Sequence, residues 1–113
     1  KAEEKNPREP RLTVWIWISY GGKAEIARAA RAAQETDGQV TEESLAKHLW
    51  TSGMPDPDLI IRTGGEQRLS NFLLWQSAYS ELFFLKTHWP AFTKVDLEAV
   101  LKEYGERERR MGT

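Results

Sequence analysis

Three short apolar runs along the chain have the pattern of buried strands. The first covers residues 12–18, LTVWIWI, where apolar side chains alternate onto both faces of an extended segment. The second covers residues 59–61 and the third residues 82–85. Strands that are apolar on both faces are typical of parallel sheets covered by helices. The pattern therefore predicts a parallel sheet built from these three segments.

Apolar residues between and after these runs recur at helical spacing. Residues 24–34 are rich in alanine and predict a helix, and a second, shorter helix is expected to start after Thr41, a good N-cap residue. Residues 71–78 are predicted to form a third helix with Ser70 as its cap. The last helix is expected after Thr93, which forms a capping box with the acid three residues later. Its apolar face consists of Leu97, Val100, Leu101 and Tyr104.

The predicted elements follow one another as strand, helix, helix, strand, helix, strand, helix. This order fits an α/β protein, a three-layer parallel-sheet fold with right-handed crossovers. Residues 1–11 are charged and contain Pro7 and Pro10, so we interpret them as a linker or a frayed start. Residues 12–113 are then expected to form one domain.

Composition excludes several classes of function. The chain has 113 residues and no cysteine, which excludes disulfides and thiolate metal sites. Its 16 basic residues against 17 acidic ones give a net charge of -1, which argues against a nucleic-acid binder that works by bulk attraction to phosphate. No apolar run approaches the roughly 20 residues needed to span a bilayer. We therefore expect a cytoplasmic protein in which any anion site is local.

The segment richest in candidate chemistry is residues 62–71, RTGGEQRLSN, which follows the second predicted strand. Ligands of parallel α/β sheets bind at such strand ends. Gly64 and Gly65 allow the backbone to approach a ligand closely, and the start of a following helix would offer free N–H groups. Arginine forks and a hydroxyl suit phosphate oxygens, so the segment resembles a diphosphate cradle. The candidate side chains are Arg62, Arg68 and Ser70.

The same residues also admit a plainer interpretation. Paired glycines after a strand are common, and arginines on such loops often pair with surface carboxylates. Glu81, at the start of the third apolar run, is on the same grounds a solvated carboxylate rather than a metal ligand. The spacing matches neither the Walker A motif nor the dinucleotide fingerprint. Residue types alone leave both interpretations open and do not name a substrate.

Longer motifs point to a family. Residues 55–84, PDPDLIIRTGGEQRLSNFLLWQSAYSELFF, closely resemble the signature of the cis-prenyltransferases, the family of undecaprenyl diphosphate synthases. Residues 19–26, SYGGKAEI, are similar to the family's Asn-Tyr-Gly-Gly-Arg segment, and residues 107–112, RERRMG, contain its C-terminal Arg-x-Gly. The form of residues 78–82 looks more like the bacterial branch than the dolichol-making one. The resemblance covers nearly all of residues 12–113.

The resemblance implies a reaction and a site. It implies that isopentenyl diphosphate condenses with an allylic diphosphate such as farnesyl diphosphate, with a product toward undecaprenyl diphosphate. Mg²⁺ is the implied cofactor and Glu81 the implied metal-linked residue. A homodimer is implied as well, with peripheral membrane association through the lipid product. The implied substrate-binding residues are Arg62, Arg68, Leu69, Ser70, Arg110 and Gly112.

The family's N-terminal His-x-Met-Asp-Gly-Asn-Gly-Arg motif has no counterpart in the chain. Residues 12–113 are therefore predicted to correspond to the C-terminal half of the family's domain, and no catalytic residue is assigned within them. We expect the isolated chain to be inactive.

The sequence departs from the family pattern at several positions. Ser19 and Lys23 stand where Asn and Arg are usual, and Ala91 replaces the acid of the usual Trp-Pro-Asp-Phe. The loss of that acid predicts that its loop is held differently. Trp15 and Trp17 are bulkier than the usual strand residues.

Two other functions compete with the substrate-binding one. The chain can be a non-catalytic partner subunit that completes the active site of another chain, or a generic phosphate-binding module. The presence of both Arg62 and Arg68 favours a chain that binds its own substrate.

Overall fold

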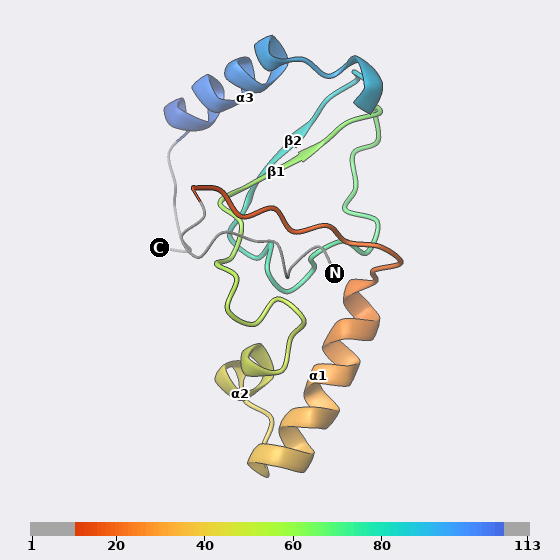
Figure 1. Cartoon of the computed structure of the whole chain (residues 1–113), viewed down its shortest axis with the longest axis vertical. Helices are drawn as coiled ribbons and strands as arrows, with labels where there is room; N and C mark the ends of the chain where they lie inside the picture. The colour runs from red at the N-terminus through yellow and green to blue at the C-terminus, as the bar shows by residue number, and fades with distance from the viewer. Residues whose placement is uncertain (1–10, 108–113) are drawn as a thin grey trace.

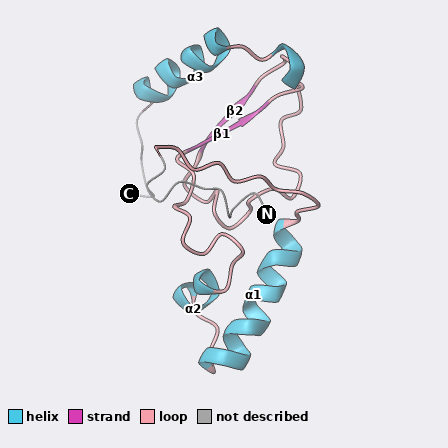
Figure 2. Ribbon diagram, viewed as in Figure 1, coloured by secondary structure: helices cyan, strands magenta, loops and turns pink. Residues whose placement is uncertain are grey.

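The computed structural model describes residues 11–107, which fold into two regions (Figure 1). Two helices, α1 and α2, form one end of the molecule, and a two-stranded sheet with helix α3 forms the other (Figure 2). The radius of gyration is 16.6 Å, against about 13 Å for a compact domain of 100 residues. The elements are α1 (Gly22–Asp37), α2 (Glu42–Lys47), β1 (Leu59–Arg62), β2 (Glu81–Phe84), the 3-10 helix η2 (Trp89–Ala91) and α3 (Lys94–Glu106).

The two predicted helices at the first end are confirmed. α1 is longer than expected and ends at Gly38, whose φ of 74° is the left-handed conformation that glycine favours. α2 begins after Thr41, whose side chain and that of Ser44 form a reciprocal capping box. The small alanines of α1 allow α2 to pack closely against it. Their shared core consists of Ala29, Leu45 and Leu49, with Ile26, Ala30 and Trp75 packed around it.

The second and third predicted strands are confirmed, and they are parallel. β1 pairs with β2 from Leu59 opposite Glu81 to Arg62 opposite Phe84. Between them the chain makes a long excursion, as a parallel pair requires. This pairing places the residues that follow β1 and those that follow β2 at the same edge of the sheet.

The predicted strand over residues 12–18 is wrong. This segment has no regular secondary structure, and Leu12, Ile16 and Ile18 are 78%, 81% and 84% exposed. A strand needs a neighbouring strand to accept and donate its backbone hydrogen bonds, and within residues 11–107 only β1 and β2 pair. Instead, Trp15 and Trp17 stack on each other, and the Trp17 ring contacts that of Tyr20 at 5.0 Å.

The predicted helix over residues 71–78 is also wrong, and Ser70 caps no helix. The segment is a series of turns in which Ser70, Asn71 and Leu73 have φ angles of 50°, 68° and 43°. An α-helix requires negative φ at each residue, so this segment cannot be helical. The spacing of its apolar residues reflects which of them are buried, not a helical period. Leu73 is buried, and Phe72 is partly exposed.

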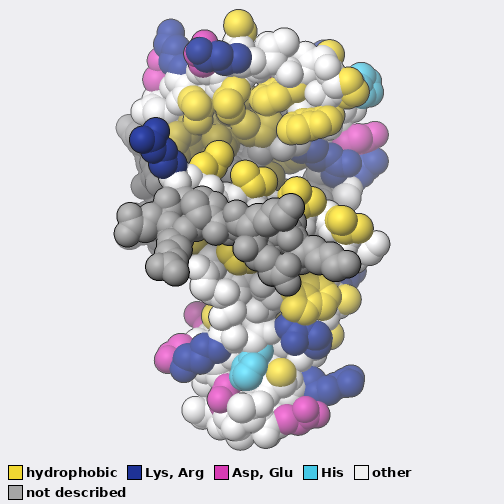
Figure 3. Space-filling model, viewed as in Figure 1, with side chains coloured by type: hydrophobic (Ala, Val, Ile, Leu, Met, Phe, Trp, Pro, Cys, Tyr) yellow, Lys and Arg dark blue, Asp and Glu magenta, His cyan; other side chains and the backbone are white. Residues whose placement is uncertain are grey.

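The last helix is confirmed, with its capping box. The Thr93 side chain accepts from the backbone of Asp96, and Asp96 Oδ2 accepts from the Thr93 N–H at 2.8 Å. Val100 is buried, whereas Leu97 and Leu101 are partly exposed. Figure 3 shows hydrophobic side chains at the surface of this end of the molecule. No helix within residues 11–107 is long and apolar enough to cross a membrane.

Candidate functional site

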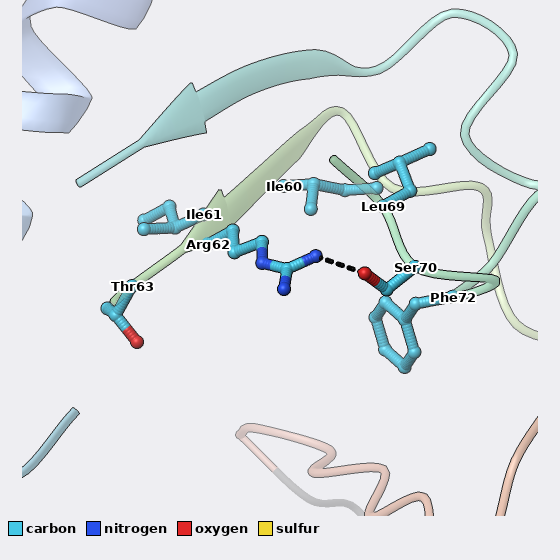
Figure 4. A pocket seen from close by; sticks show the side chains of 7 residues that line it. All are labelled: Ile60, Ile61, Arg62, Thr63, Leu69, Ser70 and Phe72. Carbon is cyan, nitrogen blue, oxygen red and sulfur yellow. Dashed lines mark hydrogen bonds between the residues drawn. The ribbon is translucent and has the colours of Figure 1, made fainter. Parts of the chain in front are cut away.

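A cavity of about 370 Å³ lies beside β1 and is lined by three of the candidate residues, Arg62, Leu69 and Ser70. Figure 4 shows Arg62 reaching across it toward Ser70, with the Phe72 ring below. One wall of the cavity comes from β1 and the residue after it. The other wall comes from the segment that follows Gly64 and Gly65. The lining residues are Ile60, Ile61, Arg62, Thr63, Leu69, Ser70 and Phe72.

Arg62 is the cation of this cavity. Its Nη1 donates to Ser70 Oγ at 2.7 Å and to the carbonyl oxygen of Arg68. A guanidinium carries five N–H donors, so it has donors beyond these two bonds. The left-handed backbone of Ser70 turns its hydroxyl toward Arg62. The pair presents a fixed positive charge and a hydroxyl to the cavity, which are groups that bind phosphate oxygens.

The glycine turn has a different role from the predicted one. Gly64 and Gly65 have φ angles of 97° and 83°, which only glycine adopts readily. Their N–H groups donate to the carbonyl oxygens of Thr87 and Leu85, at 2.9 and 2.8 Å. These amides therefore fasten the loop to the chain after β2 instead of facing a ligand. Since no helix starts at Ser70, the expectation of free helix N–H groups is wrong too, and the site is built from side chains.

The Arg68 side chain pairs with a surface carboxylate in this structure. Its Nη1 lies 2.6 Å from Glu66 Oε2, and its side chain is 63% exposed. It contributes its backbone carbonyl to Arg62 but does not line the cavity. Of the two arginines, only Arg62 is directed into the cavity.

Glu81 lies on the same sheet, at the start of β2, and is held in an ion pair. Arg107 Nη1 donates to Glu81 Oε2 at 2.8 Å, and Arg107 Nη2 donates to Glu103 at 2.8 Å. The hydrogen bond to Glu81, followed by the one to Glu103, raises the pKa of the Arg107 guanidinium above its ordinary value. The guanidinium also lies 3.8 Å from the centre of the Phe83 ring. Glu81 is therefore neither a free metal ligand nor a merely solvated carboxylate.

No cluster of three or more His, Asp or Glu side chains suited to a metal ion occurs in the described part of the chain. One carboxylate at Glu81 is compatible with Mg²⁺, which takes one or two carboxylates together with phosphate oxygens. Arg110 and Gly112, the other predicted substrate-binding residues, lie outside the described residues.

Sequence reasoning missed a buried polar network beside the cavity. Glu25 is 0% exposed and accepts hydrogen bonds from the Tyr20 hydroxyl, from Gln76 Nε2 at 3.0 Å and from the Trp50 N–H at 2.8 Å. Burial, then the hydrogen bond to Glu25, raises the pKa of Tyr20. A signal was present in the sequence, because Glu25 stands four residues before Ala29 on the buried stripe of α1.

A known protein family matches nearly the whole chain. Residues 1–112 match the model of the protein family described as "Putative undecaprenyl diphosphate synthase". The chain belongs to the undecaprenyl diphosphate synthase family. The family predicted from residues 55–84 is thereby confirmed.

Curated members of this family match over almost the whole chain. It is 50% identical to the "Short-chain Z-isoprenyl diphosphate synthase" of Mycobacterium leprae, over 98% of this chain and 47% of that protein. It is 48% identical to the "(2Z,6E)-farnesyl diphosphate synthase" of Mycobacterium tuberculosis, again over 98% of this chain and 47% of that protein. The chain spans about half the length of the curated relatives it matches.

Solved structures of the family confirm the predicted α/β fold class. The chain superposes on a probable undecaprenyl diphosphate synthase from Campylobacter jejuni with a TM-score of 0.77 and 43% identity, covering 85% of this chain and 45% of that one. It is equally similar, with a TM-score of 0.77 and 40% identity, to the lavandulyl diphosphate synthase of Lavandula x intermedia in complex with dimethylallyl diphosphate. That comparison covers 85% of this chain and 44% of the other.

The departures from the family pattern have structural correlates. Ser19 has a φ of 54°, a conformation that the usual Asn tolerates better. The Lys23 N–H donates to Asn71 Oδ1 at 2.8 Å, a contact that does not depend on the Lys23 side chain. At Ala91 the turn of η2 is held by its own backbone, and the Trp89 and Phe92 rings stack at 5.9 Å.

Proposed function

We propose that this chain carries the isopentenyl diphosphate site of a cis-prenyltransferase. In the proposed reaction, a new carbon–carbon bond joins isopentenyl diphosphate to an allylic diphosphate such as farnesyl diphosphate. Diphosphate leaves the allylic substrate, and loss of a proton from the isopentenyl unit produces a cis double bond. Undecaprenyl diphosphate is the product that the sequence resemblance favours, whereas the two mycobacterial relatives are named a short-chain Z-isoprenyl diphosphate synthase and a (2Z,6E)-farnesyl diphosphate synthase.

The observation that carries the proposal is the placement of Arg62 and Ser70 in one cavity, with Nη1 and Oγ 2.7 Å apart. A diphosphate needs a cation with several directional donors and a neutral hydroxyl, and this pair supplies both. Leu69 and Phe72 add apolar wall to the same cavity, which suits a ligand with a hydrocarbon part.

The remaining predicted residues have supporting roles in the proposal. Arg68 is exposed on the loop beside the cavity, so its side chain can exchange Glu66 for a phosphate oxygen. Glu81 would hold Mg²⁺ together with diphosphate oxygens, where the ion stabilises the negative charge that develops on the leaving group. Arg110 and Gly112 would complete the site across a homodimer interface. A cytoplasmic location and attachment to membranes through the lipid product belong to the same proposal.

Calorimetric titration of the chain with isopentenyl diphosphate, with and without Mg²⁺, tests the proposal. Arg62→Ala is expected to weaken binding by about tenfold or more, since charge-assisted hydrogen bonds contribute roughly 1.5–3 kcal/mol each. Arg68→Ala is expected to have a smaller effect because Arg68 does not line the cavity. Arg31→Ala, an exposed arginine of α1, is the matched control and leaves affinity unchanged.

Absence of binding by a chain that circular dichroism shows to be folded would contradict the proposal. That result would instead favour the partner-subunit function, in which the chain completes a site on another protein. Sedimentation of the chain as a monomer at high concentration would contradict the homodimer.

A further inference from the structure

The segment that carries Ser70 is held in an unfavourable backbone conformation. Ser70, Asn71 and Leu73 all have positive φ angles, at 50°, 68° and 43°. For residues with a Cβ this left-handed region is costly, and it persists only where surrounding contacts impose it. Such strain gathers at binding sites, and here it lies beside Arg62 and the cavity. The contacts that impose it are therefore of functional interest.

One set of contacts comes from the start of α1. The carbonyl oxygen of Asn71 accepts from the Gly22 N–H at 2.7 Å, and Asn71 Oδ1 accepts from the Lys23 N–H at 2.8 Å. Two N–H groups that would lack partners at the start of α1 are satisfied by one residue. The approach is close, because a Cβ on Gly22 would lie 2.9 Å from the Leu74 side chain. Asn71 thus fastens the segment to a rigid helix.

A second set of contacts comes from the interior. Gln76 is 2% exposed, and its Nε2 donates to Glu25 Oε2 at 3.0 Å and to Thr51 Oγ1 at 2.8 Å. Because Glu25 is a buried carboxylate, each donor directed at it is costly to remove. The Tyr20 hydroxyl, which also donates to Glu25, places its ring edge-on to Phe72 at 5.6 Å.

Both attachments hold the segment that carries Ser70 and Phe72, two of the residues that line the cavity. Asn71 lies between Ser70 and Phe72, and Gln76 lies near the end of the series of turns. A shift of the segment would move the Ser70 hydroxyl away from Arg62. Neither Asn71 nor Glu25 lines the cavity.

We propose that Asn71 and Glu25 are positioning residues for the diphosphate site: they lock residues 70–76 onto α1 and thereby hold Ser70 against Arg62. The proposal rests on the proposed function, since it assigns these residues a role in isopentenyl diphosphate binding. They act through Ser70 and are not themselves contacts of the substrate.

The test is a double-mutant cycle on isopentenyl diphosphate affinity, measured by calorimetry on the full chain. Asn71→Gly keeps a residue suited to positive φ and the backbone bond to Gly22, and it deletes the side chain that accepts from the Lys23 N–H and packs near Gly21. Glu25→Gln keeps the shape and replaces one acceptor oxygen with a donor group. Each is expected to weaken binding about fivefold or more, and Ser70→Ala to weaken it by a similar factor.

Double variants that contain Ser70→Ala distinguish a positioning role from a general loss of stability. If Asn71 and Glu25 act through Ser70, adding Asn71→Gly or Glu25→Gln to Ser70→Ala weakens binding little further. Losses that multiply in the double variants would overturn the proposal. Thr93→Ala, which removes the cap of α3 away from the cavity, is the control for a loss of stability and leaves affinity unchanged.

A second measurement distinguishes failure of this inference from failure of the proposed function. If the unaltered chain does not bind isopentenyl diphosphate, the proposed function fails. The position of Ser70 is then read from the NMR signal of the Arg62 side-chain N–H. A shift of that signal in Asn71→Gly and Glu25→Gln toward its position in Ser70→Ala supports the positioning role, and an unchanged signal overturns it.

Discussion

Arg107 Nη1 lies 2.8 Å from Glu81 Oε2, so the first residue after α3 is paired with the first residue of β2. The contact joins the helix to the sheet, and it occupies the carboxylate proposed to hold Mg²⁺. Metal binding and the ion pair therefore draw on the same carboxylate group.

This competition predicts that removal of the Arg107 charge strengthens metal binding. Arg107→Leu keeps apolar packing on Phe83 and frees Glu81, so affinity for Mn²⁺ in the presence of isopentenyl diphosphate is expected to rise about two- to fivefold. Electron paramagnetic resonance titration measures the free ion. Glu103→Gln, which removes the other partner of Arg107 and leaves Glu81 paired, serves as control. Equal affinity in Arg107→Leu and the unaltered chain would contradict the competition between Arg107 and the metal for Glu81.

Two glycine-to-alanine substitutions are predicted to have opposite effects on stability. Gly64 has a φ of 97°, so Gly64→Ala is expected to destabilise the chain by about 1–2 kcal/mol. Gly105 lies inside α3 and has open space where a Cβ would lie, so Gly105→Ala is expected to stabilise the chain by about 0.5–1 kcal/mol. Urea unfolding measures both free energies. A Gly64→Ala chain as stable as the original would refute the strained turn.

The partly buried phenol of Tyr20 is expected to lose its proton at a pH above the ordinary range of tyrosine. Burial and the hydrogen bond to Glu25 raise the pKa of Tyr20 above its ordinary value of 10.0. The folded state therefore favours the neutral phenol. The stability that this contributes is complete below pH 10 and is lost as the pH rises further.

Ultraviolet absorbance measures phenolate formation directly. Tyr20→Phe is expected to remove an absorbance step that lies above pH 10, and Tyr79→Phe, which leaves the hydrogen bond between Tyr20 and Glu25 intact, is the control. A Tyr20 step at or below pH 10 would contradict the buried network around Glu25.

The core between α1 and α2 predicts a large effect of shortening Leu49. Leu49 is 6% exposed and belongs to the cluster with Ala29 and Leu45. Leu49→Ala is expected to lower the free energy of unfolding by about 2–5 kcal/mol. Leu12→Ala is the matched control. Because Leu12 is 78% exposed, this substitution is expected to change the free energy of unfolding little. Similar losses in both variants would mean that residues 12–18 are packed as a strand after all.

Local patterns in the sequence were reliable where an element carries its own signals. Thr41 and Thr93 cap helices because each hydroxyl accepts a hydrogen bond from the backbone N–H three residues later. This contact is local and needs no partner distant in the sequence. Residues 59–61 and 82–85 predicted parallel strands because β-branched and aromatic residues in short runs fit a covered sheet. The family, too, could be recognised from residues 55–84.

Predictions failed where an element depends on partners distant in the sequence. Residues 12–18 have a strand pattern, but pairing requires a neighbouring strand, and the described residues provide none for them. Residues 71–78 have helical spacing, yet they form turns in which Asn71 and Gln76 bond to Lys23 and Glu25 of α1.

By itself, the sequence determined the family, the α/β class, the helix caps and the identity of the candidate anion-binding residues, because these depend on residue types and short spacings. Only the tertiary structure decided how those residues are used. It directed Arg62 into the cavity and Arg68 toward Glu66, and it paired Glu81 with Arg107. It also buried Glu25 as the centre of a network. The physical reason is that charged and polar side chains choose among partners by distance in space, and those distances exist only once the chain is folded.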